Sequence, residues 1–342
     1  MIDAGTSRGP RQARHSNPWL KRLAQAIVVV AALLYLVRLA RRHATELADL
    51  RLTIAYAPLL AASLLTLAGY LVNVIVWVAS LRWWDQHLHF RAALRIWFLS
   101  NLARFIPGVV WQFAGLATMS YAAGLSPVAA TSAILLQQVG LLCTGLLVSL
   151  LLAPGVIPAW TAGLGTTTHL GRAAHTAAAL AEGLSVFTRV LFALAMVAVV
   201  VALLPVAVRV AARVWGRMTG KAAAMPALTW RNSSLYLAAL LIPWILYGAA
   251  FWLFGIALIG DHAPSIAVAT AAFVTSYVAG IIVVIAPAGI GVREVVLYSA
   301  LAPIIGPRDA FVLSLLSRLW LVAVEVAAAL VVLALPRASR PD

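Results

Sequence analysis

The chain has 342 residues, of which 63% are hydrophobic and only 10% are charged, and its formal net charge is +15. Soluble domains are about 45–50% apolar and about 25% charged, so this composition excludes an ordinary soluble domain and predicts a polytopic helical membrane protein. Most basic residues lie in the N-terminal tail and in loops, where topology and anionic lipids account for them, so we expect no nucleic-acid partner.

Several apolar runs approach or exceed the roughly 20 residues that a helix needs to cross a hydrocarbon core. We predict transmembrane helices near residues 20–38, 57–80, 126–153, 187–208, 235–258, 266–285 and 310–335. Two further apolar segments, 92–122 and 286–306, are interrupted by proline and glycine. The expected fold is therefore an all-α polytopic membrane protein with about 7–9 transmembrane helices and two broken, re-entrant segments.

A single membrane domain is predicted to make up most of the chain. Residues 1–19 form a basic cytoplasmic tail, residues 20–336 form the transmembrane domain, and residues 337–342 form a short C-terminal tail. The stretches between predicted helices are too short to bury a core of their own. The first apolar run continues into Arg38 and Arg41 without a clear small-residue cleavage site, so we predict an uncleaved helix rather than a signal peptide.

Basic residues predict the orientation of the chain. They are concentrated in the N-terminal tail, in 82–95 and in loop 209–231, which should be cytoplasmic, whereas loop 154–186 should be external. The full span 126–153 already connects these two sides, so segment 92–122 must enter and leave on the cytoplasmic side. The expected product is a multi-pass protein of the cell membrane with a cytoplasmic N-terminus. The side of the C-terminus stays open.

Arg104 lies three residues before Pro107 and Gly108, inside the first broken segment. Proline and glycine interrupt a helix, and a helix that restarts after them points free N–H groups toward anions. A cation beside such a helix end is repelled unless an anion lies between them. The pattern therefore favours a site for a phosphate or carboxylate. In the alternative interpretation, the Arg104 side chain extends to the cytoplasmic headgroups.

The second broken segment contains PAGIGVREVVL, residues 287–297. Its small and kinking residues precede Arg293 and Glu294, so a loop opens a helix that has charges in its first turn. Glu294 suits the positive end of a helix, whereas Arg293 needs another partner. Non-helical backbone at membrane depth is tolerated where it lines a cavity, which is how we interpret this segment.

In the last predicted span, Arg318 and Glu325 are seven residues apart and share one side of the helix. They either pair through an intermediary or pair with Glu294 and Arg104 on neighbouring helices. Charges inside a membrane are costly and are functional candidates by default. The five embedded charges sum to three positive and two negative, so a cavity that they share has one spare cation for an anion. The alternative is a purely structural ion-pair network.

Two stretches, followed by Arg318 and Glu325, resemble the flippase-like, lysylphosphatidylglycerol-synthase transmembrane-region family of bacteria and archaea. The stretches are Asn101-Leu-Ala-Arg104-Phe-Ile-Pro107-Gly108-Val-Val-Trp111-Gln112 and Pro287-Ala-Gly289-Ile-Gly291-Val-Arg293-Glu294. The resemblance extends from about residue 20 to 335. It implies a helical bundle with re-entrant segments around a lipid-accessible cavity, and movement of lipids or lipid-linked compounds between leaflets. The aminoacyl-transfer domain of bifunctional members has no counterpart in these residues, so we expect no synthesis of lysyl-lipid.

The candidate headgroup site combines positions that the resemblance implies with two amides. The residues are Arg104, Pro107, Gly108, Trp111, Gln112, Gln138, Gly289, Gly291, Arg293, Glu294, Arg318 and Glu325. Gln137 and Gln138 stand where an acid is expected in many relatives, which leaves the headgroup preference open. Their amides either line the site or join helices.

The leading functional hypothesis is a flippase or transporter of an anionic lipid or lipid-linked substrate, of the phosphatidylglycerol or polyprenyl-phosphate type. One alternative is a membrane-embedded glycosyl or lipid-modifying transferase, for which the available acids are Glu46, Asp49 and Asp261. Another is a non-catalytic membrane partner of a lipid or cell-envelope biosynthetic complex. We assign no catalytic residue, cofactor or metal. The expected partners are the anionic lipid, the surrounding membrane lipids and biosynthetic enzymes of the same pathway.

Overall fold

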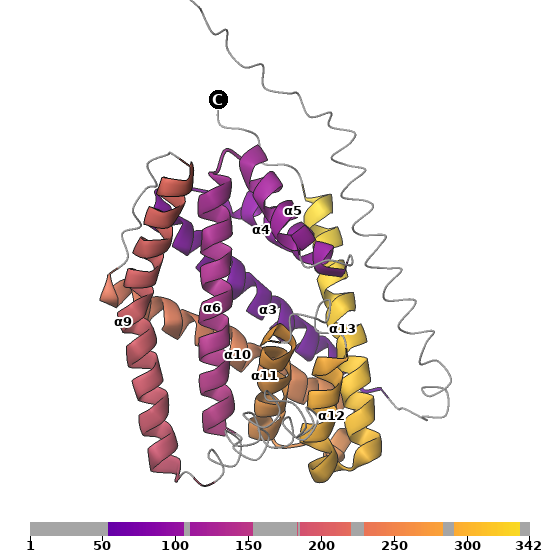
Figure 1. Cartoon of the computed structure of the whole chain (residues 1–342). Coiled ribbons are helices and arrows are strands. Elements are labelled where there is room, and N and C mark those ends of the chain that lie inside the picture. The colour runs from indigo at the N-terminus through magenta and orange to yellow at the C-terminus, as the bar shows by residue number, and fades with distance from the viewer. Residues whose placement is uncertain are drawn as a thin grey trace, which may run out of the picture.

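The long apolar runs form helices throughout the part of the chain that the structure, a computed structural model, describes: residues 54–105, 110–152, 183, 185–219, 229–282 and 291–335. No strand occurs among these residues, so the predicted all-α class is confirmed. The helices are α3 (Tyr56–Leu81), α4 (Phe90–Leu102), α5 (Val110–Ala122), α6 (Pro127–Leu152), α9 (Val186–Thr219), α10 (Trp230–Ile259), α11 (Ile266–Ile282), α12 (Val292–Ile305) and α13 (Pro307–Ala334) (Figure 1).

Four of these helices are long and apolar enough to cross a membrane: α3, α6, α10 and α13. They correspond to the predicted spans 57–80, 126–153, 235–258 and 310–335. The predicted spans 187–208 and 266–285 are also helical, as α9 and α11, but their apolar parts, Phe187–Leu203 and Ile266–Ile281, are shorter than the other four. The predicted span 20–38 lies outside the described residues.

Small residues bring the spanning helices into close contact around α10. A Cβ atom added to Gly69 of α3 would lie 2.4 Å from Cε1 of Tyr247, and one added to Gly140 of α6 would lie 2.5 Å from Cδ1 of Leu240. Within lipid no hydrophobic force holds helices together, so close packing and hydrogen bonds must do so. Glycine at these positions permits that packing.

Helices α4 and α5 form a hairpin. α4 is followed by a 3₁₀ turn at Ala103–Phe105, and α5 runs back antiparallel to α4, with Nε2 of Gln112 donating to Oδ1 of Asn101 at 2.6 Å. At the open end of this hairpin, the backbone N–H of Ser126 donates to Oε1 of Gln86 at 2.8 Å. The chain before α4 and the chain after α5 therefore lie at the same end of the molecule, which we call the Gln86 end.

Helices α11 and α12 form a second hairpin. α12 begins after Gly291, whose φ of 87° is a conformation that glycine adopts readily. The first turn of α12 lies against α11, where Arg293 packs on Tyr277. At the open end, Nδ1 of His262 lies 3.4 Å from Oδ2 of Asp309. We call this the Asp309 end.

The long helix α13 contacts both hairpins along its length. Near the Gln86 end, Nη2 of Arg95 in α4 donates to the carbonyl oxygen of Leu333 at 2.9 Å. The closed ends of the two hairpins reach α13 at Glu325 and Arg318, about 10 Å apart along the helix axis. The hairpins thus approach from opposite ends of the molecule and meet near its middle, as Figure 1 shows for α4 and α5 above and α11 and α12 below.

Candidate functional site

A cavity of about 310 Å³ lies where the two hairpins meet. Helices α3, α4, α5, α6, α10, α11, α12 and α13 all contribute to its wall. Three cations line it: Arg104, Arg293 and Arg318. Among the described residues, no aspartate or glutamate lines it. Its electrostatic character is therefore positive, which favours an anion inside it.

The first of these arginines, Arg104, forms an ion pair with Glu325 of α13. The two side chains have different surroundings: 29% of the Arg104 side chain is exposed, but only 1% of the Glu325 side chain. Glu325 Oε1 is buried and has no hydrogen-bond partner among the described residues. The carboxylate thus lies behind its arginine, and the guanidinium faces the cavity. Because guanidinium has five N–H donors, Arg104 can contact a ligand while it holds Glu325.

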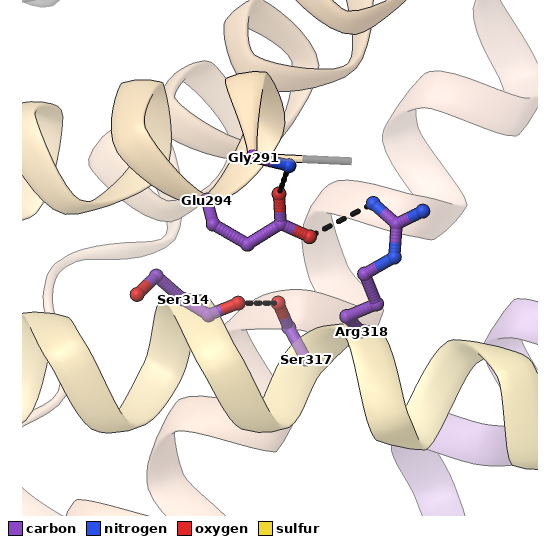
Figure 2. A network of polar contacts seen from close by, with 5 residues as sticks. All are labelled: Gly291, Glu294, Ser314, Ser317 and Arg318. Carbon is purple, nitrogen blue, oxygen red and sulfur yellow. Dashed lines mark hydrogen bonds and ion pairs between the residues drawn. The ribbon is translucent and has the colours of Figure 1, made fainter. Parts of the chain in front are cut away.

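Arg318 pairs with Glu294 across α12 and α13, as Figure 2 shows. Its Nη1 lies 2.8 Å from Oε1 of Glu294. The other carboxylate oxygen of Glu294 accepts the backbone N–H of Gly291 at 2.7 Å. Glutamate at the third position of a helix commonly satisfies the N-cap N–H in this way. One carboxylate therefore fixes both the first turn of α12 and the position of a cavity arginine.

Arg293 is placed differently from the other two arginines. Its guanidinium carbon lies 5.3 Å from the ring centre of Phe273 and 4.9 Å from that of Tyr277, both in α11. Such distances are typical of cation–π contacts. The two carboxylates that lie behind the cavity wall, Glu325 and Glu294, pair with Arg104 and Arg318, and among the described residues no acid forms an ion pair with Arg293. It is the spare cation that the charge count predicts.

A network of amides joins α3, α6 and α10 at the cavity wall. Nε2 of Gln137 donates to the backbone oxygen of Asn73 at 2.9 Å and to its Oδ1 at 3.0 Å. Nδ2 of Asn73 donates in turn to the hydroxyl of Tyr247 at 2.8 Å. Oε1 of Gln137 is buried and has no hydrogen-bond partner among the described residues. Gln137 thus lines the site and also joins two helices.

The sequence-predicted residues fall into three groups. Arg104, Gln112, Gln138, Arg293 and Arg318 line the cavity. Glu294 and Glu325 lie behind the cavity wall. Of the two predicted arrangements, the structure has the one in which they pair with arginines of neighbouring elements, Arg318 and Arg104. Pro107, Gly108 and Gly289 lie outside the described residues.

Two predicted site residues do not line the cavity. Trp111 is 52% exposed, because α5 turns the adjacent Gln112 toward α4 and so directs Trp111 outward. Gly291 is also exposed, and its part is to begin α12 by donating to Glu294. Both positions follow from helix geometry at the hairpin ends, where neighbouring residues point in different directions.

Several lining residues lie outside the predicted set, among them Asn73, Asn101 and Tyr247. Asn73 had a usable signal, because a buried amide in the middle of an apolar span needs a partner or a ligand. Asn101 lies inside the Arg104 motif. Tyr247 carried no such signal, because an aromatic residue in a membrane helix looks the same in sequence whether it packs in the core or faces a cavity.

Comparisons with known proteins neither confirm nor contradict the expected family. No family model matches the chain, and no curated protein matches it. The resemblance to the flippase-like family therefore rests on the two motifs and the later Arg318 and Glu325 alone, and it enters below only as support for a proposal.

Proposed function

We propose that the protein binds the anionic headgroup of a lipid or lipid-linked compound in this cavity and moves it between the two leaflets. The observation that carries the proposal is Arg293, a cation on the cavity wall with no acid paired to it among the described residues. A cation removed from water is costly unless an anion compensates it. A phosphate between Arg293 and the guanidinium groups of Arg104 and Arg318 supplies that compensation.

The two hairpins support a position for this cavity near the middle of the bilayer. Helices α4 and α5 have 13 residues each and are about 20 Å long, less than the hydrocarbon core of about 30 Å. We propose that both hairpins are re-entrant and enter from opposite faces. Broken helices that meet at mid-membrane are a recurring arrangement in transporters. The headgroup is then reachable from either leaflet.

Charge favours one orientation. Arg82, Arg91 and Arg95 belong to the Gln86 end, whereas at the Asp309 end Arg308 is accompanied by the acids Asp261 and Asp309. By the positive-inside rule, the Gln86 end is cytoplasmic. The end of α13 lies there too, since Arg95 donates to the Leu333 carbonyl, so the C-terminus is proposed to be cytoplasmic. One crossing by residues 20–38 before α3 then leaves the N-terminus on the same side, in the cell membrane.

The size of the cavity indicates how a lipid would move. A space of about 310 Å³ is at the small end of ligand sites, so it accepts a headgroup rather than whole acyl chains. The chains stay in the hydrocarbon while the charged group passes through the protein, which removes the main energetic barrier to its transfer. The two nearby carboxylates are both held by arginines and do not line the cavity, which favours binding and transfer of the headgroup over glycosyl or lipid-modifying chemistry.

A reconstitution assay tests the proposal. Liposomes containing fluorescent phosphatidylglycerol are prepared with and without the protein, and the accessibility of the probe to a membrane-impermeant reductant is followed over time. We expect the protein to speed transfer and Arg293→Gln to slow it at least about tenfold, because an ionic contact to the headgroup is lost.

The matched control is Arg308→Gln. Arg308 is an exposed arginine at the start of α13, away from the cavity, so its loss should leave the rate unchanged. Equal transfer by wild type, Arg293→Gln and protein-free liposomes would rule out the proposed function.

A further inference from the structure

We infer that Glu325 takes up a proton when the cavity binds an anion, so that the headgroup and a proton bind to the protein together. This inference rests on the proposed function and adds the ion that is coupled to it. The observation behind it is the unequal bonding of the two carboxylates that pair with cavity arginines.

The carboxylate of Glu294 is bonded at both oxygens. Oε1 lies 2.8 Å from Nη1 of Arg318, and Oε2 accepts the backbone N–H of Gly291 at 2.7 Å. Glu325 pairs with Arg104 through Oε2, whereas its Oε1 is buried and has no hydrogen-bond partner among the described residues. Its side chain is 1% exposed, against 22% for Glu294. Because a buried carboxylate is stable only where other groups compensate its charge, the negative charge of Glu325 depends on Arg104.

Arg104 is shared between Glu325 and the cavity. Its side chain lines the cavity and is 29% exposed, so an anion bound there lies beside the same cation as the carboxylate. Two negative charges that share a site favour the uptake of a proton by one of them. A phosphodiester stays ionised, so Glu325 is the group that becomes neutral. The proton comes from water in the cavity and binds to Oε2, which faces Arg104, when the guanidinium turns toward the anion; no other covalent bond forms or breaks.

Two tyrosine hydroxyls lie within electrostatic range of Glu325: those of Tyr70 in α3 and Tyr247 in α10. A tyrosine hydroxyl is uncharged at neutral and acidic pH. The guanidinium of Arg104 keeps its charge over the same range. These neighbours therefore do not change their charge under the conditions in which a carboxyl group titrates.

Arg95 of α4 and Glu294 of α12, whose helices also contact α13, have other partners. Arg95 donates to the carbonyl oxygen of Leu333, about two turns along α13 from Glu325, and Glu294 pairs with Arg318. The described histidines are exposed at the two ends of the molecule: His87, His89 and His262. Because both oxygens of Glu294 are bonded, Glu325 is the described residue near the cavity whose charge is expected to change between neutral and mildly acidic pH.

The rate of transfer at two pH values tests this linkage. Short-chain fluorescent phosphatidylglycerol is added to the outer leaflet of liposomes that have the same pH on both sides, about pH 8 or about pH 5.5. The label that remains outside is measured with the impermeant reductant after all samples are returned to one pH. The phosphodiester keeps its charge throughout, so only the protein changes. We expect wild type to transfer the lipid at least about tenfold faster at the lower pH, because the proton removes a negative charge beside the bound anion.

Glu325→Gln tests the residue itself, because glutamine imitates the neutral carboxyl group. We expect this variant to transfer the lipid at both pH values at least as fast as wild type does at the lower one. The matched control is Glu294→Gln in the other ion pair, which should keep the dependence on pH whatever its effect on the rate. His262→Gln, at an exposed position of the Asp309 end, should leave both the rate and its dependence on pH unchanged.

The outcomes distinguish the two levels of proposal. If wild type transfers the lipid equally fast at both pH values, or more slowly at the lower one, the linkage to a proton is wrong and the proposed function stands. A dependence on pH that persists in Glu325→Gln shows that another group takes up the proton, and it also overturns the inference. If wild type speeds transfer at neither pH, the proposed function fails and the linkage fails with it.

Discussion

Arg104 and Glu325 illustrate how unequal the two sides of one ion pair are. Arg104 borders the cavity and is partly exposed, whereas Glu325 is almost fully buried in α13 with one oxygen unpartnered among the described residues. An arginine that loses its carboxylate can still turn to water in the cavity. A carboxylate that loses its arginine in this position has no such compensation. The stability of the pair should therefore depend on which partner is removed.

We predict that Arg104→Gln destabilises the protein more than Glu325→Gln does. Leaving a buried charge without its partner costs about 3–5 kcal/mol, and only the first variant does so. Thermal unfolding in detergent measures the difference. The double variant Arg104→Met/Glu325→Leu should recover much of the loss, because neither charge remains. A larger loss for Glu325→Gln, or no recovery in the double variant, would contradict this prediction.

At the scale of helices, the distance between α10 and its neighbours depends on glycine residues. Gly248 faces α11, where a Cβ atom would lie 2.3 Å from Oγ1 and 2.6 Å from Cβ of Thr270. Gly255, two turns further along, has more room, since a Cβ atom there would first meet Ala263 at 3.5 Å. These distances set how closely α11 approaches α10, and α11 carries the two rings that hold Arg293.

Gly248→Ala should therefore destabilise the protein by about 1–3 kcal/mol, because the added methyl group forces α10 and α11 apart. Gly255→Ala on the same helix is the matched control, and it should be neutral or slightly stabilising because alanine favours the helix. Unfolding midpoints of the two variants in the same detergent give the comparison. Equal midpoints would contradict this prediction, because they would show that α10 and α11 accommodate the methyl group without loss of stability.

The whole molecule is organised by two hairpins that enter from opposite ends and share α13. Contacts at each open end establish the arrangement: Gln86 with Ser126, and His262 with Asp309. The four long helices α3, α6, α10 and α13 provide the candidate crossings. This arrangement brings two interrupted segments, far apart in sequence, to one cavity.

Cysteine labelling tests the proposed membrane topology. In a Cys143→Ala background, we expect His87→Cys and Ala123→Cys to react with an impermeant maleimide from the cytoplasmic side, and Ser265→Cys from the outside. His87, Ala123 and Ser265 are all exposed. Opposite accessibility of positions 87 and 123 would mean that the segment from α4 to α5 crosses the membrane once and is not re-entrant.

The sequence alone determined the features that depend on local chemistry. Continuous apolar runs predicted α3, α6, α10 and α13 closely, because a helix in lipid must satisfy its own backbone. Proline and glycine predicted interruptions within 92–122 and before α12, because they act on the backbone where they stand. The sequence also gives the surplus of one cation, because the five embedded charges can be counted without knowing which of them pair.

Only the tertiary structure decided which charges pair and which residues face the cavity. The sequence left open whether Arg318 and Glu325 pair through an intermediary or with Glu294 and Arg104, and it did not select Asn73 as a partner for Gln137. These contacts join residues 24 to 221 positions apart. They depend on how closely helices approach, which small residues such as Gly69 set through packing across the bundle rather than through any local pattern.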